Sequence, residues 1–592
     1  MITKRTLAHT LAGLTCLTNT AYSQSAESRL INLQAGDVNI ATDIATLVEV
    51  GSNAGTPVLA SQITSDVTLT ANQTYFLQEE VFVSNGATLT IEAGAIIYGA
   101  SFELGAGTSD NVVGSIIVTR GADIVVQGTA TNPVVMTTID SIESLRNIDI
   151  DDDGVIADAP TQETTGRWGG LAILGNAFVA NFTDSDTDPT NGNEINLHES
   201  SIEGFGGVGF ANTDGDAFSD LLEFGNSANS DPSVLAVNNA ESSGSIQFLS
   251  IRHGGFALAD GNEINGLTMA GVGSGTVIDH VEVASNEDDA FEWFGGTVNT
   301  SHLVASFSND DAFDIDLGHS GDHQFWFAIY DSTGGDHGGE WDGTAVNGDN
   351  GVRGDGLGNS QPFIANVTFL DAGSSPTTEA FRFDDFFSGL LINSAIDDFG
   401  AGETFDNEPD GVGGFLGLAG NFFAGANNVA PAFDPGNTYN TSLGLVSVSD
   451  EPNGLLDPRP AAGSPLIGSA FPFDTSQRPF LENVSYVGAF DPDGELFISG
   501  WTFLQEVGFL PAPVETGEVE IVDCAVEGAN FRIDFNSELN VSYMITFSTD
   551  LTDGFSSIVS GQTGIPGTGG VVSSTFLVPG GASRIFFRVE EE

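Results

Sequence analysis

Apolar and polar residues alternate in short runs along much of the chain, and one such pattern returns after 22 residues. The sequence from His280 reads HVEVASNEDDAFEWFGG, and the sequence from His302 reads HLVASFSNDDAFDIDLG. A shift of 22 residues superposes these two histidines and also places Phe291 on Phe313. A weaker third copy, FWFA, begins at Phe325 and is expected to continue the same 22-residue period.

A fixed short period indicates stacked units, each of which buries its apolar side chains against the next. Alternation of apolar and polar residues is typical of strands, so each unit is predicted to be a coil of short strands. Earlier stretches, 81–94 and 116–128, show the same order of strand, glycine turn and strand. The sequence therefore predicts an all-β protein built around a parallel β-helix, a solenoid with coils of about 22 residues.

The remaining segments are arranged around this solenoid. Residues 24–65 lack a clear period, whereas Phe531, Ile533 and Phe535 alternate like a strand of a small β-sandwich. The expected parts are a cap at 24–65, the β-helix at 66–510, acidic insertions within it at about 140–165 and 181–222, a linker at 511–514 and a β-sandwich at 515–592. The glycine- and proline-rich stretch 400–510 is expected to close the C-terminal end of the solenoid.

The N-terminus has the three parts of a secretory signal peptide, here assigned to residues 1–23. Lys4 and Arg5 form the positive part, residues 7–17 are apolar, and Ala21-Tyr22-Ser23 is an acceptable cleavage site. We therefore expect a secreted or cell-surface protein. No other apolar run is long enough to cross a membrane. After cleavage Cys524 is the one remaining cysteine, so no intrachain disulfide is expected.

Charge narrows the range of partners. The chain has 82 acidic and 14 basic residues and a formal charge of −68. Such a charge disfavours nucleic acid and anionic membranes as partners. It suits a protein kept soluble in salty water, or one that divalent cations neutralise, and both explanations stay open.

The best calcium candidate is NTDGDAFSDLLE, residues 212–223. An EF-hand-type loop needs oxygen ligands at positions 1, 3, 5, 9 and 12. These positions are Asn212, Asp214, Asp216, Asp220 and Glu223. Position 6 is Ala217 where glycine is preferred, and a plain acidic surface loop is the alternative. A weaker candidate is the run Asp149, Asp151 and Asp153, in which Pro160 replaces the closing glutamate, and the run at 184–188 is weaker still.

Longer phrases resemble a known family. The coil phrases, RWGGLAILG, DDAFEWFGGTVN and the closing DPRPAAGSP, VGAF and GWT resemble a family of secreted bacterial right-handed parallel β-helix proteins over about residues 60–505. The chain is more distantly similar to the pectin-lyase-like superfamily. The resemblance implies a right-handed helix but no activity. The C-terminal phrases YMITFSTDLTDGF and RIFFRV resemble β-sandwich modules of exported enzymes and surface proteins.

Two aspartate pairs, Asp288-Asp289 and Asp310-Asp311, are 22 residues apart and so are expected on adjacent coils about 4.8 Å apart. Such carboxylates repel one another unless they are protonated, hydrogen-bonded or bridged by a cation. Three interpretations stay open. The aspartates cap coil corners by accepting hydrogen bonds from backbone N–H groups, they form a calcium ladder, or they act as paired catalytic carboxylates, with Asp289 and Asp311 as the candidates. Polygalacturonase-type glycosidases also carry aspartates on adjacent coils, but their Arg-x-Lys clamp is missing here.

Histidines and arginine give further candidates. His280 and His302, at the same coil position, are expected to stack, and His319 and His323 are a weak metal candidate. Arg382 would serve as the base of a calcium-dependent lyase.

These features predict an exported, calcium-stabilised protein that binds an extracellular polysaccharide or surface glycan in an adhesive or structural role. The alternative is a polysaccharide-degrading lyase or glycoside hydrolase. A groove lined by arginine and carboxylates would favour the enzyme, and a smooth acidic face would favour binding.

Overall fold

The computed structural model describes residues 14–16, 42–43, 60–71, 74–77, 80–99, 101–102, 112–146, 157–179, 224, 238–257, 264–331, 334–343, 360–371, 378–384, 387–397, 399, 405–407, 417–424, 436–449, 451–511, 521–527, 530–536, 542–548, 557–559, 561–566, 571–577 and 585–591. It divides into two compact units, one of residues 24–511 and one of residues 512–592 together with 1–23. Among the helices in these ranges, none is both long and apolar enough to span a membrane.

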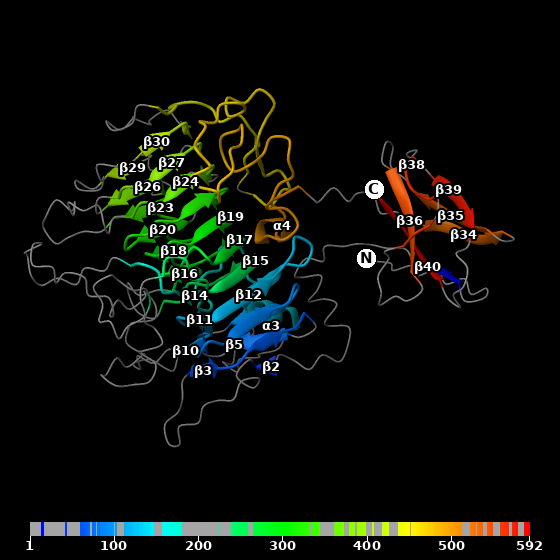
Figure 1. Cartoon of the computed structure of the whole chain (residues 1–592), viewed down its shortest axis with the longest axis horizontal. Coiled ribbons are helices and arrows are strands. Elements are labelled where there is room, and N and C mark those ends of the chain that lie inside the picture. The colour runs from blue at the N-terminus through cyan, green and yellow to red at the C-terminus, as the bar shows by residue number, and fades with distance from the viewer. Residues whose placement is uncertain are drawn as a thin grey trace, which may run out of the picture. The chain divides into compact units, whose positions relative to one another are not determined.

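The larger unit is a stack of coils whose strands run parallel in two long sheets (Figure 1). The ten-stranded sheet contains, in order along the stack, β3 (Ala60–Ile63), β6 (Glu80–Val83), β11 (Ser115–Val118), β14 (Leu171–Leu174), β16 (Leu267–Ala270), β18 (Phe291–Phe294), β20 (Phe313–Asp316), β23 (His337–Asp342), β26 (Glu379–Asp384) and β29 (Phe405–Asn407). Every pairing within this sheet is parallel.

The eighteen-stranded sheet forms the rest of the wall. Its strands are β2 (Thr42–Asp43), β4 (Val67–Leu69), β5 (Thr74–Leu77), β7 (Thr88–Ile91), β8 (Ile96–Gly99), β12 (Asp123–Gln127), β13 (Val134–Thr138), β15 (Gly244–Arg252), β17 (Val277–Ala284), β19 (Asn299–Ser306), β21 (Asp322–Gln324), β22 (Phe327–Tyr330), β24 (Phe363–Ala365), β25 (Thr368–Asp371), β27 (Leu390–Ile392), β28 (Ala395–Ile396), β30 (Gly417–Ala419) and β31 (Phe422–Phe423). Two strands of one coil, such as β12 and β13, pair with the two ends of the single long strand β15. β15, β17 and β19 each bend at a residue with positive φ: Phe248 (49°), His280 (55°) and His302 (54°).

The structure confirms the predicted 22-residue period for the first two copies. Val281 pairs with Leu303, and Phe291 pairs with Phe313. The third copy is offset by one residue from the prediction, because Val304 pairs with Phe327, 23 positions later. The cause is local: residues 317–321 connect β20 to β21, whereas the shorter segment 295–298 connects β18 to β19.

Aromatic rings from successive coils fill the interior. Phe291 stacks on Phe313 with ring centroids 5.4 Å apart, and Phe313 lies 4.4 Å from Trp326. Trp293 lies 5.1 Å from Trp326, and all of these side chains are buried. Stacked rings of this kind contribute about 0.5–1.5 kcal/mol per pair beyond the burial of their area.

The closing segment has two roles rather than the single predicted one. Tyr439 stacks on Phe423 at 4.8 Å and continues the end of the stack. Residues 456–510 instead return along the eighteen-stranded sheet, where Leu456, Trp501 and Leu504 pack with Phe327 in one apolar cluster. The outer face of this sheet carries apolar side chains that need a cover, which explains the return.

Short elements complete this unit: the hairpin of β9 (Ser101–Phe102) and β10 (Val112–Val113), the hairpin of β32 (Leu445–Ser447) and β33 (Asp457–Pro460), and the helices α3 (Asp140–Arg146) and α4 (Phe503–Glu506).

The second unit is a β-sandwich, as predicted. One sheet contains β34 (Ile521–Glu527), β35 (Asn530–Asn536) and β39 (Val571–Leu577). The other contains β1 (Leu14–Cys16), β36 (Ser542–Ser548), β37 (Ser557–Ile558), β38 (Ile565–Pro566) and β40 (Ile585–Glu591). Buried Phe535 of the first sheet meets buried Tyr543 of the second, with ring centroids 5.3 Å apart. The signal peptide, which includes β1, stays a prediction.

Candidate functional site

The register of the ten-stranded sheet aligns one outward position of every coil. Successive residues of a strand point to opposite faces. Because Phe291 and Trp293 are buried in the interior cluster, Glu292 between them points outward. The pairings place the following residues in one column along the stack: Phe82, Ile117, Ala172, Thr268, Glu292, Asp314, Glu340 and Arg382. We call this set the outer column.

The second half of the outer column is charged. Arg382 donates from Nη1 to Oε1 of Glu340 at 2.8 Å, and its Nη2 lies 3.3 Å from Oδ2 of Asp384. The side chains of Arg382 and Glu340 are 31% and 23% exposed, so both remain accessible to a ligand. Oxygens of Asp289, Glu292 and Asp314 lie within 4.8 Å of one another.

Crowding of these carboxylates changes their protonation. Burial, and then the negative charges of Glu292, Asp342, Asp316 and Glu340, raise the pKa of Asp314 well above its ordinary value. Carboxylates this close cannot all remain ionised without a proton or a cation between them. The charged half of the column is therefore built to hold protons or positive groups.

The aspartate pairs lie at the corner just before this sheet. Oδ1 of Asp289 accepts a hydrogen bond from the backbone N–H of Asp311 on the next coil, at 3.0 Å. Oδ1 of Asp311 likewise accepts from the backbone N–H of His337 at 2.6 Å. These are the contacts that corner capping requires. Because both carboxylates are buried and already occupied, they are poorly placed to attack a substrate.

His337 gives the corner a positive charge. Its Nδ1 lies 3.0 Å from Oδ1 of Asp311 and 3.6 Å from Oε2 of Glu340. Burial opposes this charge, but the hydrogen bond to Asp311 and the charges of Asp311, Asp336 and Glu340 raise the pKa of His337 to about 9. His337 is therefore protonated at neutral pH. Burial still raises the pKa of Asp311, although the contact with His337 acts in the opposite direction.

Two groups of corner carboxylates have the spacing that a cation needs. Oxygens of Asp288, Asp289 and Asp310 lie within 4.8 Å of one another, and so do those of Asp310, Asp311 and Asp336. Burial, followed by the charges of Asp288, Asp314, Asp311 and Asp310, raises the pKa of Asp289 well above its ordinary value. Oxygen-only clusters are the environment that Ca²⁺ prefers. The loop 212–223 and the aspartates at 149–153 and 184–188 lie outside the described residues.

The histidine pair inside the solenoid is fully engaged in hydrogen bonds. Nε2 of His319 lies 2.8 Å from Nε2 of His323, and Nδ1 of His319 lies 2.8 Å from the carbonyl of Gly295. A carbonyl only accepts, so His319 carries its proton on Nδ1, and its Nε2 accepts from His323. Nδ1 of His323 then accepts from the hydroxyl of Thr300, which in turn accepts from Trp326 Nε1 at 3.0 Å.

This network uses both lone pairs that a metal would need. Burial lowers the pKa of His319 to about 4 and lowers that of His323 well below its ordinary value, so both rings are neutral. The arrangement supports a structural role.

His280 and His302 stack as predicted. The rings of His280 and His302 lie 4.3 Å apart and nearly parallel, and Phe248 and Phe325 extend the ladder at either end. Nδ1 of His302 is hydrogen-bonded to Oδ1 of Asp279 at 2.9 Å, and Nδ1 of His280 lies 3.0 Å from Oδ2 of the same residue.

Sequence reasoning missed Glu292, Asp314, Glu340 and His337. For the three carboxylates a signal was available, because FEWF, FDID and EWD each place a charged residue between or beside apolar ones. On a strand that pattern points the charged residue outward. What the sequence did not give was the alignment of coils that have unequal lengths.

The family of the β-helix follows from its sequence. Residues 61–147 and 222–421 match the family model described as a pectate-lyase-like β-helix domain, so the β-helix of this chain belongs to that family. The predicted likeness to the pectin-lyase-like superfamily is thereby confirmed.

Among solved structures, endo-xylogalacturonan hydrolase from Aspergillus tubingensis is similar at 10% identity and a TM-score of 0.26, over 65% of this chain and 90% of that chain. A likeness of this degree says nothing about activity. No curated protein matches the chain.

Proposed function

We propose that this protein is exported and binds an extracellular polysaccharide along the charged half of its outer column. The observation that carries the proposal is the alignment of Glu292, Asp314, Glu340 and Arg382 on four successive strands. The pectate-lyase-like family of the β-helix favours a polysaccharide as the ligand. The signal-peptide-like N-terminus supports action outside the cell, either secreted or on the surface.

The chemistry of the column suits a repeating ligand. Carboxylates accept hydrogen bonds from sugar hydroxyls, and the guanidinium of Arg382 donates them. Neighbouring strands are about 4.8 Å apart. Asp314, Glu340 and Arg382 are partly exposed and present polar groups at three successive steps along the stack, whereas Glu292 is only 2% exposed. An extended polymer lying along the stack would meet several such groups at once, and this supports binding in an adhesive or structural role.

Calcium is the cofactor that we propose for this site. The groups Asp288–Asp289–Asp310 and Asp310–Asp311–Asp336 supply the oxygen ligands. A bound cation would offset the charges of Asp288, Asp311 and Asp310, which add to burial in raising the pKa of Asp289, and it would stabilise the folded state. The loop 212–223 is a second proposed calcium site on its sequence alone.

A second function, glycoside hydrolysis, is favoured by the contrast between Asp314 and Glu340. Burial beside other carboxylates raises the pKa of Asp314, which suits a general acid. Glu340 on the adjacent strand is ion-paired with Arg382 and partly exposed, a position that suits a general base or nucleophile. Glycosidases of both stereochemical outcomes use such a pair.

One experiment separates the two functions. The purified protein and the variants Asp314→Asn, Glu340→Gln and Asp493→Asn are incubated with neutral and acidic polysaccharides, with calcium or with a chelator, and both binding and chain cleavage are measured. Asp493 is exposed and lies in the closing segment, so its variant is a control for loss of one charge.

The binding role predicts retention of a polysaccharide without cleavage, and weaker retention by the two column variants than by the control. Cleavage by the native protein that is lost in both column variants would establish the hydrolase instead. Equal retention by all four proteins would refute the outer column as the binding site.

A further inference from the structure

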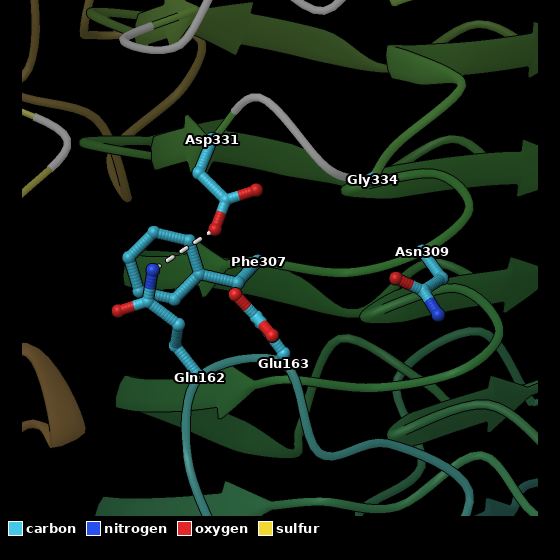
Figure 2. Close-up of a pocket in the computed structure, with 6 residues that line it drawn as sticks. All are labelled: Gln162, Glu163, Phe307, Asn309, Asp331 and Gly334. Carbon is cyan, nitrogen blue, oxygen red and sulfur yellow. Dashed lines mark hydrogen bonds between the residues drawn. The ribbon is translucent and has the colours of Figure 1, made fainter.

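A cavity of about 210 Å³ lies beside the corner, at the ends of β19 and β22 (Figure 2). Its lining residues are Gln162, Glu163, Phe307, Asn309, Asp331 and Gly334. Gln162 and Glu163 come from the segment that precedes β14, whereas Phe307, Asn309, Asp331 and Gly334 come from two successive coils. This site is separate from the outer column.

The polar groups that face the cavity are hydrogen-bond acceptors. Nε2 of Gln162 donates to Oδ2 of Asp331 at 3.1 Å. Nδ2 of Asn309 donates to Oε2 of Glu287 at 3.1 Å. Nδ2 of Asn309 also donates to Oγ1 of Thr165 at 3.3 Å, so both lining amides donate to protein oxygens. Figure 2 shows the carboxylate of Glu163 directed inward and the amide oxygen of Asn309 turned toward the space below Asp331.

Gly334 leaves room for the side-chain oxygen of Asn309. A Cβ atom at position 334 would lie 2.7 Å from Oδ1 of Asn309, closer than side chains tolerate. Its backbone does not need glycine for its φ angle, so the requirement is one of space. Phe307, 5% exposed, gives the cavity an apolar wall and packs on Phe509 behind it.

Two carboxylates and an amide oxygen facing one small cavity call for a ligand that is positively charged and donates hydrogen bonds. The volume exceeds many times the roughly 10–15 Å³ that one water needs. The cavity also has an apolar wall, formed by Phe307. Its size and this wall suit an organic cation with an apolar body.

We infer that this cavity binds a sugar that carries a protonated primary amine. The ammonium group donates to Glu163, Asp331 and the Asn309 oxygen, and the sugar ring lies against Phe307. The ammonium part of the inference rests on the cavity alone, and the sugar part rests on the proposed function.

The test is calorimetric titration of the full chain with D-glucosamine, D-glucose, N-acetyl-D-glucosamine and ethanolamine. Glucosamine is expected to bind saturably and at least about tenfold more tightly than either sugar without the amine, because only it forms charge-assisted hydrogen bonds. Ethanolamine, which lacks the ring, is expected to bind more weakly than glucosamine.

Matched variants locate the site. Glu163→Gln and Gly334→Ala are each expected to weaken glucosamine binding by about tenfold or more, through loss of a charge and displacement of the Asn309 oxygen. Glu451→Gln, which removes an exposed charge in the closing segment, should leave the affinity unchanged. The titration uses single sugars and variants at the cavity, so its result stands whether or not the outer column binds a polymer.

Absence of saturable glucosamine binding, equal affinity for glucose, or equal affinity of the Glu163→Gln and Glu451→Gln proteins would each overturn the inference. Ethanolamine binding as tightly as glucosamine would overturn the assignment to a sugar.

Discussion

The two halves of the ten-stranded sheet differ in what covers their outer faces. In the first half, Phe82, Ile117 and Ala172 are buried in one apolar cluster together with Val179 and Phe224, which lie outside the sheet. In the second half, the equivalent positions are Glu292, Asp314, Glu340 and Arg382, and Asp314, Glu340 and Arg382 are only partly buried. The inner faces of both halves belong to the same continuous core.

This difference shows how a solenoid separates stability from function. The inner face and the covered half of the outer face bury apolar side chains, which drives folding. The charged half instead holds carboxylates near one another. Burial, together with these like charges, raises the pKa of Asp314. Groups whose pKa values are shifted by burial and by like charges are typical of functional sites. This supports the charged half as the proposed site of function.

The largest effect should come from putting a charge in the covered half. Ile117 is 0% exposed, so Ile117→Asp should destabilise the protein by about 4 kcal/mol or more, because it removes apolar contacts and buries a polar group without a partner. Urea denaturation of the purified protein measures the change. Ile117→Val is the conservative control, at about 1 kcal/mol. A small loss for Ile117→Asp would mean that the covered half tolerates charge and that the contrast between the halves is weaker than we infer.

Calcium bound at the corner beside the charged half should stabilise the folded protein. If it binds only the folded protein, it should stabilise by about 2.7 kcal/mol at a hundredfold excess over its dissociation constant. The melting temperature should therefore rise between chelator and millimolar calcium. The double variant Asp288→Asn with Asp310→Asn should lose most of this gain, whereas Asp214→Ala with Glu223→Ala reports on the loop 212–223.

If calcium stabilises both double variants as much as the native protein, neither proposed site binds it. If the native protein itself does not respond, calcium is not its cofactor.

Corner capping predicts an effect of intermediate size. Asp289→Ala should cost roughly 1–3 kcal/mol, because the buried N–H of Asp311 loses its acceptor. Asp289→Asn keeps an acceptor oxygen and should cost much less. Thermal unfolding in chelator measures both variants without interference from metal. Asparagine as damaging as alanine would show that the carboxylate charge matters more than the cap.

The smallest effect concerns Asp314 and pH. Its pKa is higher in the folded protein than in the unfolded chain, so the folded state binds this proton more tightly. The stability that this group contributes is present in full below the unfolded value of about 3.9 and is lost as pH rises through the raised folded value. The native protein should therefore gain stability as pH falls from neutral, and Asp314→Asn should flatten that dependence.

At neutral pH, Asp314→Asn should stabilise the folded protein, because it removes a buried carboxyl group that burial and the neighbouring negative charges disfavour in its ionised form. Melting temperatures in chelator across the pH range give the comparison. A native curve and a variant curve of equal slope would contradict the raised pKa.

Much of the fold could be predicted from the sequence because it rests on local repetition. The 22-residue spacing of His280 and His302 gave the coil, and the two rings do stack. The 22-residue spacing predicted the strand pairing correctly between residues 280 and 313, where the coils are of equal length. It failed by one residue at Phe327, because the connection at 317–321 is longer, and a change in a turn leaves the apolar pattern of the strands unaltered.

The candidate site was predicted only in part. The sequence singled out the paired aspartates and Arg382, which lie at one corner and on the adjoining sheet. It did not single out Glu340, which becomes a neighbour of Asp314 and Arg382 only through pairing across coils of 26 and 42 residues.

What the sequence determined by itself is the repeating unit, the inward apolar face and the strong negative charge, since each depends on residues close together in the chain. Only the tertiary structure decided which half of the outer face is covered and which carboxylates meet. The reason is geometric: stacking brings residues from separate coils to within hydrogen-bond distance, while insertions of different length lie between them. Burial and neighbouring charge, which set the protonation of Asp314 and His337, exist only once those coils are stacked.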